Sequence, residues 1–277
     1  MYSLPALSPC VFIPRDHILI VLKSYFDGGG EADSAQYDHL TLAAMIGRPK
    51  HWRKFDQAWK RTLAKHHANY LHTTDAANLK GLYEDWDDES VDEFLNDCVT
   101  VIQDNTAPQK FGAGIRAITV TVVLKDLVRA NRENPQIGTA EENCVIPCLN
   151  AALIFGQRSG CTKFECYFDQ GEHFYGHVKD RMVNKRSKKH DSILADIVHL
   201  GESNMRLVPA LQAADLFAWS VNDACHDHPL RTWQHRLLVD TFRGKEFLDY
   251  DMLTKDVNYE ELLKIRSWNM PTRKRPR

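Results

Sequence analysis

Three aspartates stand where their carboxylates could meet and do chemistry. Asp27 ends the apolar run HILIVLKSYF, and Asp169 ends the run KFECYF. Both runs read as strands, and open α/β sheets place their ligands at the carboxyl ends of strands. Asp215 lies in the otherwise apolar stretch LVPALQAADLFAWSV, where a buried charge is costly unless positive charge meets it. Converging carboxylates repel one another unless divalent cations neutralise them, and oxygen ligands favour Mg²⁺ or Mn²⁺.

Each aspartate also has a purely structural interpretation. Asp27 and Asp169 precede loops that contain glycine, where aspartate often only forms a turn. Asp215 could instead form a buried ion pair with an arginine such as Arg206. Taken together, the three residues favour a site over three separate structural roles.

The elements that must position these residues alternate along the chain. Apolar runs predict strands at residues 17–26, 39–47, 115–124, 163–169 and 195–201. A helix follows Pro49 with Trp52, Phe55, Trp59 and Leu63 at helical spacing, and an acid-rich segment opens another. Further helices are predicted at 141–155, 173–188 and 209–225, whereas YLHTTD (Tyr70–Asp75) reads as extended.

The order of these elements predicts an α/β fold. Residues 49–111 read as a helical insertion between the second and third strands. Without them the order is three strands in a meander followed by strand–helix alternation, which is the order of the ribonuclease H-like fold. We therefore expect a mixed five-stranded sheet flanked by helices, in a single domain over 1–277 with its core at about 17–226. The basic end, residues 271–277, is expected to be disordered.

Several motifs resemble those of one protein family. They are YFD at Asp27, YLHTTD at Tyr70–Asp75, CYFDQ at Asp169 and VPALQAADLFAW at Val208–Trp219. On these pieces the chain resembles the bacterial and phage-borne proteins of the domain of unknown function 3800 (DUF3800), which are grouped with the ribonuclease H-like superfamily. That family usually follows the first aspartate with glutamate, serine and glycine, whereas Gly28–Gly30 follow here. The departure removes one possible acidic ligand.

The resemblance implies a metal-dependent nuclease that hydrolyses phosphodiester bonds with two Mg²⁺ or Mn²⁺ ions. Asp27 would bridge the two ions, while Asp169 and Asp215 would each hold one of them. One ion would lower the pKa of an attacking water and the other would stabilise the leaving oxygen.

Four further residues compete for supporting roles in such a site. Glu172, Asp75 and His72 are alternatives for a fourth ligand. His72 could instead move protons to or from the water or the leaving group. Gln212 lies one turn before Asp215 and would orient a ligand or touch the substrate.

A nucleic-acid substrate requires local positive charge, because the net charge of the chain is only −2. The predicted helix over 173–188 and the residues after it hold one basic cluster: Lys179, Arg181, Lys185, Arg186, Lys188 and Lys189. A phosphate backbone could follow this cluster, although it could equally be a solvated helix face. The acidic segment 84–97 would lie away from the nucleic acid or contact a protein partner. The alternative function is a catalytically inactive nucleic-acid-binding or protein-interaction module, docking through the helical insertion.

Composition narrows the cellular setting. No apolar run approaches the ~20 residues that span a bilayer, so we expect no membrane partner. The N-terminus lacks the basic start of a signal peptide, and seven cysteines in no tight framework favour a reducing cytoplasm. A zinc site from Cys144 and Cys148 with His173 and His177 is possible by spacing, but no C-x2-C pair supports it.

Overall fold

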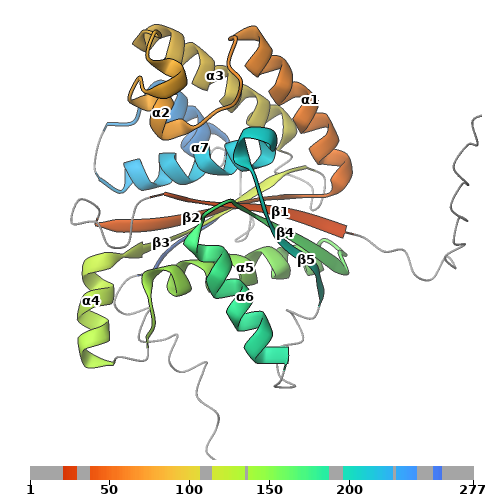
Figure 1. Cartoon of the computed structure of the whole chain (residues 1–277), viewed down its shortest axis with the longest axis vertical. Helices are drawn as coiled ribbons and strands as arrows, with labels where there is room; N and C mark the ends of the chain where they lie inside the picture. Colours follow the sequence, from red (N-terminus) through yellow and green to blue (C-terminus); the bar gives the residue numbers. More distant parts are fainter. Residues whose placement is uncertain are drawn as a thin grey trace, which may run out of the picture.

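The apolar runs of the chain pair into one mixed sheet (Figure 1). The structure is a computed structural model that describes residues 21–29, 38–106, 114–134, 137–186, 196–226, 229–241 and 252–257. Its strands are β1 (Val21–Gly29), β2 (His39–Gly47), β3 (Arg116–Val123), β4 (Lys163–Asp169), β5 (Ile197–Ser203) and β6 (Met252–Val257). Within the described residues they follow the order β5-β4-β1-β2-β3-β6.

The strand directions place two of the three aspartates side by side. β1, β2 and β3 form an antiparallel meander, and β4 runs parallel to β1, with β5 parallel to β4. The register pairs Phe26 with Phe168, so Asp27 and Asp169 come next on two neighbouring parallel strands. Their side chains leave the sheet on the same face, because successive residues alternate between faces.

Helices cover both faces of the sheet (Figure 1). The first face carries α1 (Pro49–Lys65), α2 (Thr73–Ala77), α3 (Asp88–Asn105) and α7 (Pro209–Ala224). The second face carries α5 (Ala140–Arg158) and α6 (His173–Arg186), with α4 (Leu124–Glu133) beside them. Each layer has its own cluster of buried apolar side chains against the sheet. Short elements complete the described chain: η1 (Gly81–Tyr83), η3 (Met205–Leu207), α8 (Thr232–His235) and a π-helix, η4 (Arg236–Thr241).

The close packing of α7 on the sheet follows from its small residues. Ala210, Ala213 and Ala214 are buried, and α7 contacts both β1 and β2. Gly29 of β1 lies directly under this helix, because an added Cβ would come 3.1 Å from the carbonyl oxygen of Ala218. A short distance between helix and sheet brings Asp215, which is only 6% exposed, over the carboxyl end of β1.

Most of the predicted elements are confirmed, with three differences. The apolar stripes of α1 and α3 are buried, and α5, α6 and α7 agree with prediction to within a few residues of their ends. The prediction of five strands is wrong, because β6 adds a sixth beside β3. The helix α4 was not predicted, and only the first half of YLHTTD is extended, since α2 begins at Thr73. No helix in the described part of the chain is long and apolar enough to cross a membrane. The basic end, 271–277, lies outside the described residues.

Candidate metal centre

Four carboxyl groups meet where β1 and β4 end beneath α7. Burial raises the pKa of Asp27 well above its usual range, and the carboxyls of Asp215, Glu172 and Asp169 raise it further. Such mutual effects place the four carboxyls near one another in a site shielded from water, although no three of them bring ligand oxygens within 4.8 Å of one another. The structure thus brings together the three predicted aspartates and one of the three candidates for a fourth ligand, Glu172.

Glu172 reaches the cluster from the loop between β4 and α6. Its side chain contacts that of Asp27, and this contact acts to lower the pKa of Glu172. Burial first, and then the charges of Asp169 and Asp215, raise the pKa of Glu172 to about 7, although His173 acts in the opposite direction. At neutral pH this group is poised between its charged and neutral forms.

Gly28, where the sequence departs from the resembling family, lies against Glu172. A Cβ added to Gly28 would come 3.1 Å from Glu172 Oε2 and 2.6 Å from the ring of Phe174. Any side chain at residue 28 would therefore displace Phe174, which is buried in the core. The absence of a side chain at residue 28 leaves room for the carboxylate of Glu172 beside β1.

Asp215 is fixed by a backbone donor rather than by an arginine. The N–H of Thr73 donates to Asp215 Oδ2 at 2.6 Å. Burial raises the pKa of Asp215, while His72 and Thr73 partly offset the increase and Asp169 adds to it. The suggested partner Arg206 is exposed, and its guanidinium lies 5.0 Å from the centre of the Tyr70 ring. The ion-pair alternative for Asp215 is wrong in this structure.

His72 and Asp75 form a pair at the edge of the cluster. Their Nδ1 and Oδ2 atoms are 2.8 Å apart, and each side chain is about a third exposed, at 36% and 35%. His72 acts electrostatically on Asp215, whereas Asp75 is held by the histidine. This arrangement favours a proton-transfer role for His72 with Asp75 as its orienting partner.

Asp169 is also held by a backbone donor, and Gln212 supports that donor. The N–H of Met205 donates to Asp169 Oδ1 at 2.7 Å, and the Met205 carbonyl accepts from Gln212 Nε2 at 2.9 Å. Gln212 Oε1 accepts from Trp59 Nε1 at 2.7 Å and from the N–H of Leu71 at 3.0 Å. Gln212 is only 1% exposed, which favours the predicted orienting role over direct contact with a substrate.

Sequence reasoning missed the residues that hold the carboxylates. Trp59 was identified only as part of a buried stripe, although its indole N–H points at Gln212. The donors at Thr73 and Met205 are backbone groups, which leave no mark in residue type. One sequence signal could have revealed this network. A buried tryptophan usually has a hydrogen-bond acceptor for its indole N–H, and Gln212 offers one to Trp59.

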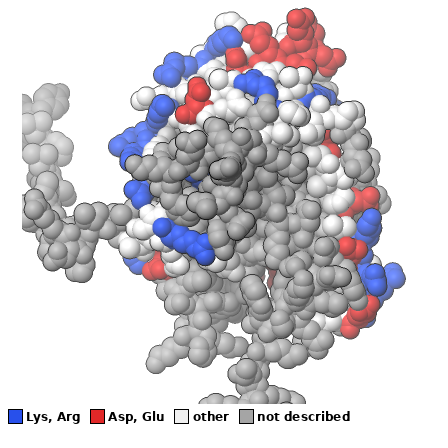
Figure 2. All heavy atoms as spheres, turned by 180° about the vertical axis from the view of Figure 1, so that it is seen from behind, with Lys and Arg blue, Asp and Glu red and all other residues white. Residues whose placement is uncertain are grey.

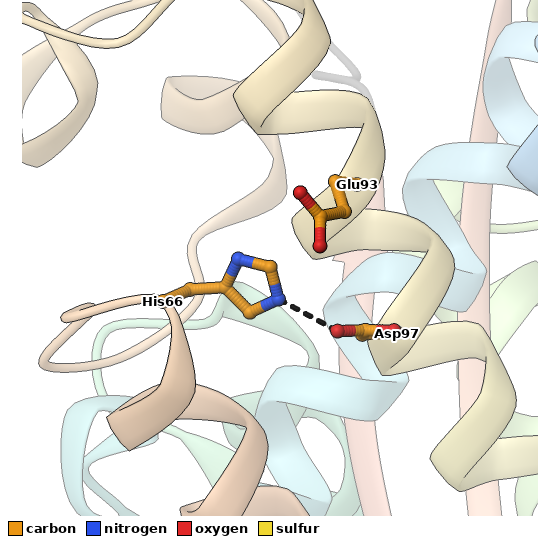
Figure 3. A group of neighbouring side chains, drawn as sticks. All are labelled: His66, Glu93 and Asp97. Atoms are coloured by element: carbon orange, nitrogen blue, oxygen red, sulfur yellow. Dashed lines mark hydrogen bonds and ion pairs between the residues drawn. The ribbon is translucent and has the colours of Figure 1, made fainter.

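A second group of possible ligands lies apart from the four carboxyls. His66, at the end of α1, faces Glu93 and Asp97 on α3 (Figure 3). Lys65 already neutralises these acids, because its Nζ lies 3.1 Å from Glu93 Oε1 and 2.6 Å from Asp97 Oδ2. His66 Nε2 also lies 2.7 Å from Asp97 Oδ2. We interpret this group as a charge network that joins α1 to α3.

The thiols that could have bound zinc are core residues. Cys144 and Cys148 are fully buried, and their thiols donate to carbonyl oxygens of Leu40 and Leu42, among others. Burial raises the pKa of both thiols, which opposes the thiolate form that zinc requires. His177 instead lies 3.8 Å from Glu142 Oε1.

The predicted basic cluster is described only in part. Lys179 is exposed on α6, with its Nζ 5.8 Å from the centre of the Tyr175 ring. Arg181, Lys185 and Arg186 belong to α6 by their backbone, and Lys188 and Lys189 lie outside the described residues.

Charge is unevenly spread over the described surface (Figure 2). Acidic side chains gather at the end of the molecule where α2 and α3 lie, and basic ones line the edge formed by α1. The exposed acids of this region stand before α3 and in its first turn: Glu84, Asp85, Asp87, Asp88 and Glu89. The acidic end is built on the helical segment between β2 and β3, whereas the carboxyl cluster lies at the sheet.

The four-carboxyl cluster fits a hard divalent cation. All four side chains offer only oxygen, which Mg²⁺ and Mn²⁺ prefer. Burial, and then neighbouring carboxyls, raise the pKa values of Asp27, Glu172 and Asp215, and a bound cation would offset both effects. Asp169 and Asp215 each give one oxygen to a backbone N–H, which leaves the other oxygen available. No model of a known protein family matches the chain, and no curated protein matches it either.

Proposed function

We propose that this protein is a Mg²⁺- or Mn²⁺-dependent nuclease with a ribonuclease H-like fold, as in the DUF3800 family that its motifs resemble. The observation that carries the proposal is the proximity of Asp27, Asp169, Glu172 and Asp215, of which Asp27 and Asp215 are buried and the other two are half-buried. These residues come from two parallel strands, a loop and a helix, so no local turn accounts for their meeting. A cluster of like charges is unfavourable by itself and is typical of a functional site.

The sheet supports the same proposal. Its meander of β1, β2 and β3 is followed by the alternation of α5, β4, α6, β5 and α7, with β1 central. The carboxyl cluster lies where strands β1 and β4 end, which is where open α/β sheets place ligands. Fold alone does not establish chemistry, so the proposal depends on the cluster.

The roles follow from the contacts of each side chain. Asp27 interacts with all three other carboxyls, so it would help to hold both ions, and Asp169 and Asp215 would each help to hold one. Glu172 supplies the fourth carboxylate. Bound divalent ions would supply an activated water and stabilise the leaving oxygen of a phosphodiester. His72, oriented by Asp75, is the residue placed to carry a proton at this edge.

Cleavage of labelled polynucleotides tests the proposal. Single-stranded DNA, duplex DNA, RNA and an RNA–DNA hybrid are each incubated with Mg²⁺, Mn²⁺ or EDTA. We expect metal-dependent cleavage of at least one substrate and its loss in Asp169→Asn, which keeps the acceptor for Met205 but removes the charge. Asp180→Asn, an exposed acid on α6, is the matched control and should cleave like the wild type.

The alternative of an inactive binding module makes a different prediction. Its main argument was the loss of an acidic residue after Asp27, and the carboxyl of Glu172 beside Gly28 weighs against that argument. An inactive module would bind nucleic acid in a salt-sensitive way and cleave none of the four substrates with either metal.

A further inference from the structure

Two backbone segments, distant in the sequence, hold two of the four carboxylates. The segment before α2 donates the N–H of Thr73 to Asp215 Oδ2, and η3 donates the N–H of Met205 to Asp169 Oδ1. These bonds are short, at 2.6 Å and 2.7 Å, as expected for a charged acceptor. The separation of the two carboxylates therefore depends on the relative position of the two segments.

Gln212 bonds to both segments at once. Its Oε1 accepts from the N–H of Leu71, two residues before Thr73, at 3.0 Å. Its Nε2 donates to the carbonyl of Met205, the same residue whose N–H binds Asp169, at 2.9 Å. A single buried amide thus joins the supports of Asp169 and Asp215.

Trp59 fixes which way this amide points. The indole N–H donates to Gln212 Oε1 at 2.7 Å, and the second neighbour of that oxygen, Leu71, is also an N–H donor. Reversing the amide would set its NH₂ group against two donors and leave the Met205 carbonyl without one. The orientation is therefore determined by its neighbours, and α1 takes part in it.

We propose that Gln212 is a positioning residue that sets the spacing of Asp169 and Asp215, with Trp59 locking its orientation. This inference rests on the proposed metal-dependent function. It explains why a glutamine stands one helical turn before the aspartate of α7 in a helix that is otherwise buried and apolar. Partners of this kind orient metal ligands, and their loss typically weakens metal affinity by ~10–100-fold.

The test is Mn²⁺ binding measured by calorimetry on wild type and Gln212→Met, with folding checked by circular dichroism. Methionine keeps the length of the side chain and removes all three hydrogen bonds. We expect Mn²⁺ affinity to fall by roughly 10–100-fold in a folded variant. Equal affinity in the two proteins would overturn the inference and leave the metal centre intact. Absence of Mn²⁺ binding by the wild type would overturn the metal centre and the inference with it.

Gln234→Met is the matched control. Gln234 is fully buried, accepts from the N–H of Arg231 at 2.8 Å and donates to Asp223 Oδ2 at 2.8 Å, all within the α7–α8 region. We expect it to keep wild-type Mn²⁺ affinity. An equal loss of affinity in this control would mean general loosening and would overturn the inference.

If Gln212→Met does not fold, the same Mn²⁺ measurement on Trp59→Phe tests the inference. It preserves an aromatic ring in the core and removes one N–H donor from Gln212. We expect Mn²⁺ affinity to fall by roughly 2–10-fold, as loss of one hydrogen bond implies. Unchanged affinity in Trp59→Phe would count against the role of the Trp59–Gln212 pair.

Discussion

Glu172 and Gly28 lie close together although they are far apart in the sequence. Residue 28 is glycine, and its missing Cβ leaves room for the ring of Phe174 and the carboxylate of Glu172. The sequence predicted the three aspartates but left the fourth ligand open among Glu172, Asp75 and His72. Only the three-dimensional structure separates these candidates, because the turn after β4 decides whether Glu172 points back toward Asp27.

Glu172→Gln should change how stability depends on pH in the metal-free protein. The pKa of Glu172 is raised from 4.5 to about 7 in the folded state. Below about pH 4.5 the group is protonated in both states. As pH rises toward 7 only the unfolded state loses the proton, so the folded state loses relative stability, and the penalty is constant above pH 7. The half-buried position limits its size to on the order of 1–3 kcal/mol.

Urea unfolding in EDTA between pH 4.5 and 8 measures this effect. The stability of Glu172→Gln relative to wild type should increase across that range and then level off. Parallel stability curves for the two proteins would show that Glu172 ionises in the folded protein as it does in water.

Asp27→Asn should stabilise the metal-free protein while removing metal binding. Burial and three neighbouring carboxyls raise the pKa of Asp27, so an uncharged amide relieves desolvation and repulsion. The melting temperature in EDTA should rise, and Mn²⁺ should no longer raise it further.

Asp97→Asn is the opposite case and serves as the control. Burial acts to raise the pKa of Asp97, but hydrogen bonds from His66 and Lys65 outweigh it and lower the pKa. Its neutralisation should lower the melting temperature and leave the response to Mn²⁺ unchanged. A lower melting temperature for Asp27→Asn in EDTA would contradict the predicted repulsion.

At the scale of elements, hydrophobic periodicity was enough to predict most of the fold. β4 was predicted with the bounds that the structure gives, and the buried stripe of α1 was predicted residue by residue. These elements are specified by their own side chains. In contrast, β6 was not predicted, and it is a strand through its pairing with the edge of β3. The helix α4 was also missed, because it begins directly after β3 with no turn-forming residues between them. The supports of Asp169 and Asp215 were not predictable, since backbone N–H groups are the same in every residue type except proline.

Gly29→Ala tests whether the spacing of α7 and β1 sets the site. The added Cβ would lie 3.1 Å from the carbonyl oxygen of Ala218, which is backbone and cannot turn aside. The helix must shift, and overpacking of this kind costs about 1–3 kcal/mol of folding free energy. We expect lower stability in urea unfolding and weaker Mn²⁺ binding, because Asp215 moves with α7.

Gly176→Ala provides the comparison for that variant. Gly176 lies inside α6 with no atom within 4 Å of an added Cβ, so alanine should stabilise the helix by roughly 0.5–1 kcal/mol. Mn²⁺ affinity should stay unchanged. If Gly29→Ala bound Mn²⁺ as tightly as wild type, the close packing of α7 would not control the site.

At the scale of the whole molecule, the net charge is small, but acidic and basic side chains lie on different parts of the described surface (Figure 2). The net charge of −2 gives no general attraction to a polyanion, so binding depends on local basic faces such as that of α1. The acidic end built by the residues around the start of α3 would repel a phosphate backbone. Under the proposed function, a nucleic acid would approach the face of α1 rather than the acidic end.

Binding of a labelled oligonucleotide should weaken steeply with salt, and the exposed pair Lys60 and Arg61 tests the side of approach. Replacing both by glutamate should reduce the slope of log affinity against log salt by roughly 1–2. Glu84→Lys combined with Asp85→Lys, at the acidic end, should leave the slope near that of wild type. The reverse result would place the nucleic acid on the acidic side.

The most direct test of the metal centre is anomalous diffraction from crystals of the protein soaked in Mn²⁺. We predict anomalous peaks between Asp27 and its neighbours Asp169, Glu172 and Asp215, and no peak at them in Asp27→Asn. A peak only at His66, Glu93 and Asp97, or no peak beside Asp27, would contradict the central claim that the four carboxyls form a metal centre.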